Sequence, residues 1–518
     1  MAEYDDQARI IAFLDTPATH GGAPVERIET HGAIVFLVGN TAFKMKKAVH
    51  LGPMDFSTLA RRETCCKAEI EINRRTAPML YRRAVPVTDE GQGRLSIGGA
   101  GQPIEWLVEM ARFKTRDLLD QVLADGRAPA DLATQLAYAI AHLHTHAARH
   151  PEAGGAAALA AIINGNMAEM DAFVPNVFDH AAARDLRDGS LAAVEAHRPL
   201  VEARRAMGCV RRCHGDLHPS NIVLVEGRAT LFDAIEFSDD IALIDTLYDL
   251  AFLLMELWHA NNHQPQPALA SAVFNGYLAA LPRDELEMQV DGLALLPLFL
   301  SMRAGVRAKI SARMNRPDAA RAYFHAAQHD LRGAPAHLVA VGGLSGTGKS
   351  VLARVLAPGF GRAPGALVLR SDVIRKQIAG IAAQDRLPAS AYTPKASAEV
   401  YAMLMRLAAR ALAAGQAVVL DAVFAREDER RHAEEVARRA GVPFEGLWLE
   451  TSEQVMRTRV ATRAVAARDA SDADGRVVAA QHAYDLGPIT WMRVDASGTP
   501  ADTQAHAAEM LARARQYD

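Results

Sequence analysis

The stretch GGLSGTGKS at residues 342–350 constrains the fold of this chain more than any other feature. It fits the pattern G-x-x-x-x-G-K-[ST] from Gly343 to Ser350, and it lies between the apolar stretch HLVAV and the helix-forming stretch SVLARVLA. In such a setting the glycines let backbone N–H groups wrap around phosphates, and the N-terminus of the following helix adds positive potential. The order strand, phosphate-binding loop, helix predicts an α/β domain with a parallel sheet.

The side chains of this loop predict a site for a nucleoside triphosphate and a magnesium ion. We expect Lys349 to reach the β and γ oxygens and the Ser350 hydroxyl to bind Mg²⁺. The part of the loop expected to hold the phosphates consists of Gly343, Ser345, Gly346, Thr347, Gly348 and Lys349.

Two predicted strands downstream end in aspartates. ALVLRSDVIRK ends its strand at Asp372, and QAVVLDAVF ends its strand at Asp421. In parallel α/β sheets ligands bind at the carboxyl ends of the strands, so both carboxylates should face the nucleotide. Further on, RVATRAVAARDASDAD places Arg459 and Arg463 one helical turn apart, with Arg468 beyond. A mobile arginine lid there would neutralise a transferring phosphoryl group and exclude water.

These features together resemble the small P-loop kinases of the gluconate, shikimate and polynucleotide kinase type, and the zeta-type toxins. The resemblance implies that Asp372 takes the proton of the substrate hydroxyl and that Arg375 grips the substrate. It also implies that the three arginines are lid residues. For Asp421 two roles stay open, a Walker-B-like residue or a structural strand end.

A second motif of phosphate-transfer type, CHGDLHPSN, occupies residues 213–221. Asp216 and Asn221 lie five positions apart in it, and ATLFDAIEF follows as a predicted strand that leads to Asp233. Phosphoryl transfer needs a carboxylate that accepts or orients the attacking hydroxyl, and oxygen ligands for the magnesium ions that bridge the phosphates. These three side chains could supply both needs.

The spacing of this motif and the trailing FDAIE resemble the aminoglycoside phosphotransferase family, and the resemblance covers most of residues 1–330. It implies that Asp216 is the catalytic base, that Asn221 and Asp233 hold magnesium, that His214 shapes the loop, and that Pro219 fixes its turn. The implied fold is an α+β kinase-like domain, in which a small sheet precedes a large helical lobe.

The same resemblance requires a strand lysine paired with a helix glutamate. GAIVFLVGNTAFKMKK at 32–47 predicts a β-hairpin around a tight turn, and the stretch after it has helical spacing. Alternation places Lys44 and Lys46 on one face of the strand and does not separate them. We expect Lys44 to pair with Glu69, with Lys46 as the alternative lysine and Glu63 as the alternative acid. No G-x-G-x-x-G precedes the lysine.

The chain has 518 residues, enough for two to four domains. A helical stretch that ends at Gly333, Ala334 and Pro335 marks the best boundary. We therefore predict a kinase-like domain over 1–333 and a P-loop kinase domain over 336–518. This order resembles a group of bacterial bifunctional proteins that join an aminoglycoside phosphotransferase to an AAA-family ATP-binding domain.

Composition excludes several other classes. The N-terminus is charged, and the longest apolar run, LALLPLFLSM, is too short to span a bilayer, so we expect a cytoplasmic protein without membrane partners. Four cysteines make no disulfide framework. Residues 337–518 carry 23 Lys and Arg against 20 Asp and Glu, a balance that disfavours a nucleic-acid partner. The oligomeric state stays open.

The sequence thus predicts a bifunctional phosphotransferase that uses ATP and Mg²⁺, with GTP still open, on hydroxyl groups of small molecules such as sugars, polyols or aminoglycosides. Two alternatives remain. The first half could be a regulatory nucleotide-binding module for one active P-loop kinase, or the second half could phosphorylate nucleic-acid ends.

Overall fold

The computed structural model describes residues 2–259, 264–381, 385–466 and 471–514. The chain divides into two compact units. The first contains residues 1–159 and 202–253, and the second contains 160–201 and 265–518. The helices of 267–332 therefore group with the P-loop sheet, while the domain boundary near 333–336 stays a prediction. Within the described residues no helix combines the length and apolar character needed to cross a bilayer.

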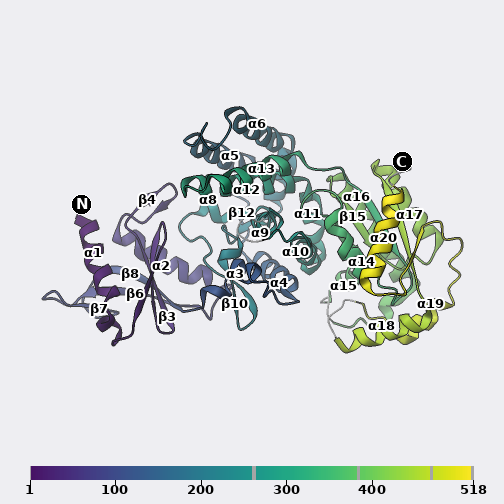
Figure 1. Cartoon of the computed structure of the whole chain (residues 1–518), viewed down its shortest axis with the longest axis horizontal. Coiled ribbons are helices and arrows are strands. Elements are labelled where there is room, and N and C mark those ends of the chain that lie inside the picture. Colours follow the sequence, from purple (N-terminus) through teal and green to yellow (C-terminus); the bar gives the residue numbers. More distant parts are fainter. Residues whose placement is uncertain (1, 260–263, 382–384, 467–470, 515–518) are drawn as a thin grey trace. The chain divides into compact units, whose positions relative to one another are not determined.

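The first unit is built on a six-stranded antiparallel sheet with the order β1-β2-β3-β8-β6-β7 (Figure 1). The hairpin predicted for residues 32–47 is confirmed, because β2 and β3 pair directly around Gly39 and Asn40. The strands are β1 (Val25–Glu29), β2 (Ala33–Val38), β3 (Thr41–Lys46), β6 (Tyr81–Asp89), β7 (Leu95–Ile97) and β8 (Gln102–Ala111).

Each face of this sheet is covered by a helix. Helix α1 (Ala2–Asp15) brings Ile10 and Leu14 against Met45 on one face. Helix α2 (Leu59–Asn73) packs on β8 and β6 at the other face. Because side chains alternate along a strand, Lys44 and Lys46 both project away from the Met45 face and towards α2. The predicted helix after the hairpin is therefore confirmed, and it lies where a lysine partner is needed.

The rest of the first unit carries helices and short hairpins. Leu132, Leu136, Ile140 and Leu143, which the spacing placed on one helical face, are all buried in α4. The elements are β4 (His50–Leu51), β5 (Met54–Asp55), α3 (Leu119–Ala124), α4 (Leu132–His146), β9 (Val210–Arg212), β10 (Ile222–Val225), β11 (Arg228–Leu231), α8 (Asp239–Ala242) and β12 (Leu243–Asp245). Three helices cross the division between the units: α5 (Gly155–Asp171), α7 (Arg198–Ala206) and α9 (Thr246–His259).

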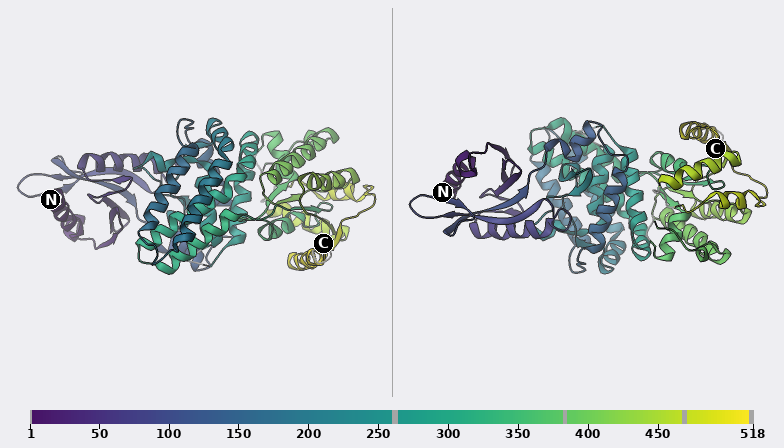
Figure 2. Two further views of the ribbon diagram at one scale, coloured as in Figure 1. Left: turned by 90° about the horizontal axis from the view of Figure 1, so that it is seen from above. Right: turned by 90° about the horizontal axis from the view of Figure 1, so that it is seen from below.

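The second unit begins with a helical layer. Helices α12 and α13 pack along each other (Figure 2), and α13 ends before Gly333, whose φ of 66° no longer suits a helix. The helices are α6 (His180–Ala196), α10 (Pro267–Ala280), α11 (Arg283–Gly292), α12 (Leu296–Arg313) and α13 (Pro317–Arg332).

A five-stranded parallel sheet with the order β14-β15-β13-β16-β17 forms the core of the second unit. It confirms the predicted parallel sheet. The strands are β13 (Leu338–Gly342), β14 (Leu367–Arg370), β15 (Val418–Asp421), β16 (Phe444–Glu450) and β17 (Met492–Asp495). The helices around it are α14 (Lys349–Leu356), α15 (Ser371–Ala379), α16 (Pro394–Ala413), α17 (Glu427–Ala440), α18 (Glu453–Ala466), α19 (Gly475–His482) and α20 (Pro500–Ala514).

One sequence-based strand end is wrong. Strand β14 ends at Arg370, and Asp372 lies in the first turn of α15 instead of at the end of the strand. A carboxylate is favoured in a first helical turn, so the polar residues after LVLR belong to the helix start. The carboxylate still lies at the carboxyl edge of the sheet.

Helix α10 closes the edge of this sheet. The Asn275 amide accepts a hydrogen bond from Val368 N at 2.6 Å and donates one to Ala366 O at 3.1 Å, so it pairs with the edge of β14 as a neighbouring strand would. Gln377 of α15 donates to Ala279 O and Leu281 O, each at 3.3 Å. The helical layer thus holds the sheet edge from which α15 starts.

Candidate active sites

In the first unit an ion-pair cluster joins β3, α2 and the segment after β11. Lys44 Nζ lies 2.8 Å from Glu69 Oε1 and 2.5 Å from Asp233 Oδ1. The pairing expected for Lys44 is therefore present, and the lysine also reaches a predicted magnesium ligand. A cation held by a buried carboxylate beside a second carboxylate suits the binding of nucleotide phosphates.

The other strand lysine belongs to the same cluster. Lys46 Nζ lies 2.6 Å from Glu69 Oε2 and also pairs with Glu236, so the two lysines share the two oxygens of Glu69. Burial alone would raise the pKa of Glu69, but Lys44 and Lys46 outweigh it and lower that pKa to about 2. Burial raises the pKa of Glu236 despite its lysine partner.

The alternative acid lies elsewhere. Glu63 pairs with Lys67 one turn along α2, and both side chains are exposed. Glu69 is fully buried. The structure thus brings Lys44, Lys46 and Glu69 together and leaves Glu63 outside the cluster. Of the two lysines, Lys44 is the one that pairs with Asp233.

The loop CHGDLHPSN holds its Asp and Asn in contact. Asn221 Nδ2 donates to Asp216 Oδ2 at 3.0 Å and to Asp216 O at 2.9 Å, and His218 Nε2 lies 3.3 Å from Asp216 Oδ2. Pro219 begins a short 3₁₀ turn, in accord with its expected role. His218 was not singled out by the sequence patterns, because a histidine two residues after an aspartate has no spacing signal of its own.

The predicted site residues meet around His214. Its Nε2 lies 2.9 Å from Phe232 O. The negative charges of Asp216 and Asp233 favour the protonated form of its ring. Burial lowers the pKa of His214, which keeps the ring neutral at pH 7. Asn221 and Asp216 are in direct contact, and the charges of Asp216 and Asp233 both act on His214, while the catalytic and metal-binding roles of the three residues stay predictions.

Two residues that the sequence did not reveal fix Asp233. Its φ is 61°, which is uncommon for a residue other than glycine. The Asn73 side chain accepts from Ala234 N at 2.8 Å and donates to Ala234 O at 3.3 Å, and the Tyr81 hydroxyl accepts from Asp233 N at 3.1 Å. These bonds hold the carboxylate towards Lys44.

The carboxylate of Asp249 holds the start of the loop CHGDLHPSN through hydrogen bonds to its backbone. This carboxylate accepts hydrogen bonds from His214 N at 3.1 Å and Gly215 N at 2.9 Å, and it lies 3.0 Å from His144 Nε2. We expect Asp249→Ala to remove these hydrogen bonds from buried groups, at a cost of about 1–3 kcal/mol for each. Amide hydrogen exchange of the loop should accelerate strongly, as measured by mass spectrometry of peptides over 210–235.

Asp240→Ala is the matched control, because Asp240 is an exposed acid on the neighbouring helix α8. Its effect should stay within about 0.5 kcal/mol. Equal exchange in the two variants would contradict the anchoring role. His144 of α4 is buried beside Asp249, while His142 and His146 of the same helix pack together with ring centroids 4.1 Å apart.

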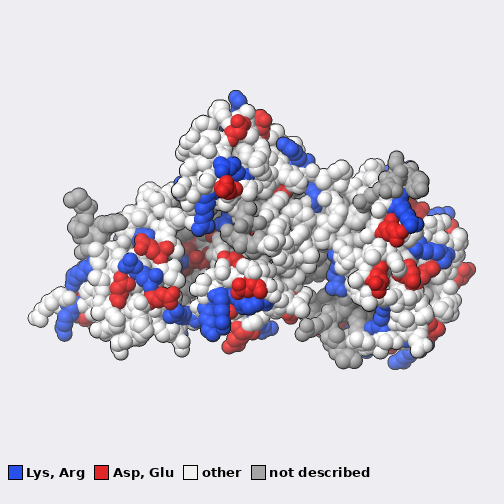
Figure 3. Space-filling model, in the orientation of Figure 1, with Lys and Arg blue, Asp and Glu red and all other residues white. Residues whose placement is uncertain are grey.

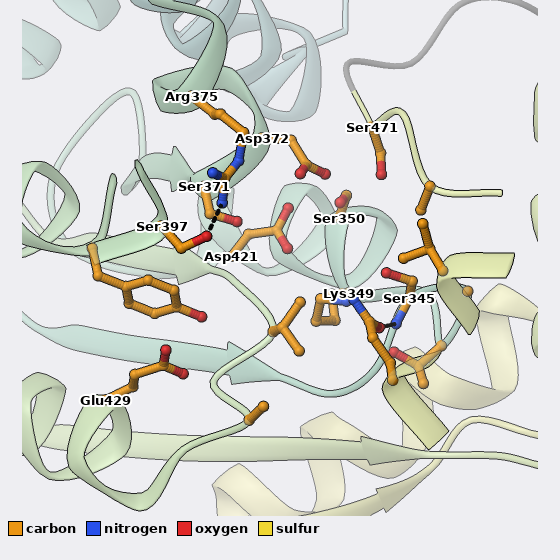
Figure 4. Close-up of a pocket in the computed structure, with 18 of the residues that line it drawn as sticks. Ser345, Lys349, Ser350, Ser371, Asp372, Arg375, Ser397, Asp421, Glu429 and Ser471 are labelled. Atoms are coloured by element: carbon orange, nitrogen blue, oxygen red, sulfur yellow. Dashed lines mark hydrogen bonds between the residues drawn. The ribbon is translucent and has the colours of Figure 1, made fainter. Parts of the chain in front are cut away.

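In the second unit the phosphate-binding loop lines a cavity of about 1760 Å³. Lys349, Ser350, Asp372 and Asp421 all face it (Figure 4). Gly343 and Gly346 have positive φ, and a Cβ on either would lie within 2.7 Å of a backbone carbonyl oxygen. Both glycines are thus required by conformation and by space.

Asp372 and Arg375 lie on one side of this cavity. Burial raises the pKa of Asp372, partly opposed by the charge of Arg370. Arg375 donates to Ala391 O at 2.6 Å and to Ser397 Oγ at 3.4 Å, and its guanidinium lies 5.0 Å from the centroid of the Tyr392 ring. An aspartate of raised proton affinity beside a fixed arginine can accept a proton from a bound hydroxyl.

Of the three arginines expected in the lid, the structure describes the side chain of Arg459. Arg459 donates to Thr347 O at 3.3 Å and to Gly498 O at 2.6 Å, so it packs on the phosphate-binding loop. The side chain of Arg463 and the whole of Arg468 lie outside the described residues. Their lid role stays a prediction.

Gln481 of α19 was missed by the sequence reasoning. Its Oε1 accepts a hydrogen bond from Ser345 N at 2.7 Å, so this side chain touches the phosphate-binding loop. A glutamine far along the chain from the loop gives no motif signal, since only the fold brings the two together.

Comparison with known families finds two matches in the chain. Residues 102–288 match the family described as "Phosphotransferase enzyme family", and residues 338–485 match the one described as "AAA domain". The predicted resemblance and the two-part fold class are confirmed. The fold, the two sites and these matches define an enzyme of the phosphotransferase class, with a kinase-like domain followed by a P-loop domain.

Among individual proteins, the chain is similar to uncharacterized proteins of Mycobacterium tuberculosis and Mycobacterium bovis. They are 29% identical over 484 residues, covering 91% of this chain and 92% of theirs. Both domains thus occur together in these relatives.

Two solved structures are each similar to part of the chain. A choline/ethanolamine kinase family protein from Mesorhizobium loti is 16% identical, covers 63% of this chain and 95% of its own, and gives a TM-score of 0.39. The APS kinase of Mycobacterium tuberculosis is 21% identical, covers 34% of this chain and 98% of its own, and gives a TM-score of 0.25.

Proposed function

We propose that this chain is a bifunctional ATP-dependent phosphotransferase, in which each of two nucleotide sites transfers the γ-phosphoryl group to a hydroxyl of a small molecule. The observation that supports the proposal is that the chain contains two clusters of side chains of the types that bind phosphate and magnesium. Lys44, Glu69 and Asp233 form one cluster, and Lys349 and Ser350 belong to the other.

In the first site Asp216 accepts the proton of the acceptor hydroxyl, and Asn221 orients Asp216 through their hydrogen bond. Lys44, held by Glu69, neutralises charge on the phosphates. Asn221 and Asp233 offer the oxygen atoms that magnesium prefers.

In the second site Lys349 neutralises the phosphate oxygens, Asp372 accepts the hydroxyl proton, and Arg375 orients the acceptor. Ser350 and Asp421 would hold magnesium. They fit a cation, because the guanidinium of Arg370 lies on both. Magnesium, when bound, supplies charge neutralisation across the phosphates.

Counting nucleotide sites tests the proposal. The whole chain should bind about two equivalents of an ATP analogue in a calorimetric titration with magnesium, and Lys349→Ala or Asp233→Asn should each remove about one. Lys67→Ala, which removes an exposed lysine paired with Glu63, should leave both. A single equivalent in the unaltered chain would contradict the proposal.

Measurements of turnover distinguish the bifunctional phosphotransferase from two alternatives, a regulatory first site and a nucleic-acid end kinase. The contact of Lys44 with Asp233 favours a first site that binds nucleotide without transferring phosphate, since the lysine occupies a magnesium ligand. If Asp216→Ala changes no acceptor-dependent ADP release while nucleotide still binds, this regulatory function holds. A nucleic-acid end kinase is disfavoured, because Lys and Arg are interspersed with Asp and Glu on the face that Figure 3 shows. Consumption of oligonucleotides alone would reverse that preference.

A further inference from the structure

Arg370 is the last residue of β14, and the sheet register places it directly beside Asp421 of β15. Parallel neighbours in register project their side chains to the same face of a sheet. Only 15% of the Arg370 side chain and 5% of that of Asp421 are exposed. A largely buried guanidinium therefore lies at the carboxyl edge of the sheet, beside the residues proposed to bind the nucleotide.

The guanidinium joins two oxygen atoms from different elements. Its Nε donates to Asp421 Oδ2 at 3.1 Å, and an Nη donates to Ser350 Oγ at 3.2 Å. Ser350 lies at the start of α14 and Asp421 at the end of β15, and both line the same cavity (Figure 4). The same positive charge also acts on Asp372.

These oxygens are the ones a magnesium ion would need in this site. The hydroxyl that ends a phosphate-binding loop ligates Mg²⁺, and Mg²⁺ requires oxygen ligands at about 2.0–2.1 Å. A magnesium ion on Ser350 would lie within about 5 Å of the guanidinium, where two positive charges repel strongly in a partly buried site. Both cations cannot hold the serine and the aspartate at once.

We propose that Arg370 is a resident cation of the magnesium position in the second site: it holds Ser350 and Asp421 together before nucleotide enters and gives up at least one of them to magnesium. The inference rests on the proposed function of this site. Arg370 thereby lowers the affinity for free divalent metal, and it supplies positive charge to nucleotide that arrives without metal. The second site then depends less on magnesium for nucleotide binding than it would without this arginine.

The test compares the binding of AMPPNP, a non-hydrolysable ATP analogue, in EDTA and in MgCl₂. The second-site signal is the part that Lys349→Ala abolishes, which removes any contribution of the first site. In Arg370→Gln the ratio of the Kd in EDTA to the Kd in MgCl₂ should rise at least about tenfold, because one charge opposing the metal and assisting the bare phosphates is lost. Mn²⁺ alone, followed by electron paramagnetic resonance, should bind at least about tenfold more tightly.

Two variants control for charge and for folding. Arg370→Lys keeps the charge and should keep the ratio of the unaltered chain. Arg431→Gln removes an exposed arginine that lines the same cavity and should not change it. A ratio in Arg370→Gln within about twofold of the unaltered chain, or an equal rise in Arg431→Gln, would overturn the inference while leaving the proposed function intact. Absence of any AMPPNP signal that depends on Lys349 would overturn both.

Discussion

Glu69→Gln should destabilise the first unit by about 3–5 kcal/mol, because it leaves the buried Lys46 and the partly buried Lys44 without their shared counter-charge. Lys44 and Lys46 lie 2.8 and 2.6 Å from the two oxygens of this carboxylate, which is fully buried. Urea unfolding and hydrogen exchange of peptides from β3 and α2 measure the loss. Nucleotide binding at the first site should weaken with it, since Lys44 loses its fixed position.

The stability lost in Glu69→Gln should become smaller as the pH falls. The pKa of Glu69 is lowered from its ordinary value of 4.5 to about 2, so its contribution to stability is complete above pH 4.5. That contribution is lost as the pH falls through about 2, and the difference between the unaltered chain and Glu69→Gln should shrink over this window. Glu63→Gln, an exposed acid on the same helix, should change stability by about 0.5 kcal/mol at most. A loss of stability in Glu63→Gln equal to that in Glu69→Gln would contradict this role of Glu69.

The sequence predicted most of the second site because its signals are local. The glycines of 342–350 permit positive φ, and the strand and helix that flank them are adjacent in the chain. The one error, the end of β14, arose where an apolar strand runs directly into a helix start, so no turn residue separates the two. Arg370 carried no signal, because only sheet register brings it to Asp421.

The first site was less predictable, because its contacts link distant segments. Alternation showed that Lys44 and Lys46 share a face, but it could not show that both reach Glu69. Asn73, Tyr81 and Asp249 act through hydrogen bonds to backbone atoms far along the chain. Side chains that hold a backbone follow no spacing rule, so they emerge only from the fold.

Asp372→Asn should abolish transfer at the second site and yet stabilise the second unit. A positioned general base contributes about 10²–10⁴-fold to a rate, so acceptor-dependent ADP release should fall by this factor. Sugars, polyols, aminoglycosides and oligonucleotides are the acceptors to compare, counting only release that Lys349→Ala abolishes. Binding of AMPPNP should persist, because the proposed role of Asp372 is to accept the hydroxyl proton and not to hold the phosphates.

The gain in stability follows from the sign of the pKa shift. Burial raises the pKa of Asp372 above its ordinary value of 3.8, so the folded chain holds this proton more tightly than the unfolded chain does. Ionisation of the buried carboxylate therefore costs stability as the pH rises through this range, and an asparagine avoids that cost at pH 7. The Tm of Asp372→Asn should exceed that of the unaltered chain at pH 7, and the difference should vanish below pH 3.8. Asp428→Asn, an exposed acid that lines the same cavity, should show neither effect. Full transfer by Asp372→Asn would assign the proton to another group, and a lower Tm would mean that attraction to the charge of Arg370 outweighs the burial of the carboxylate.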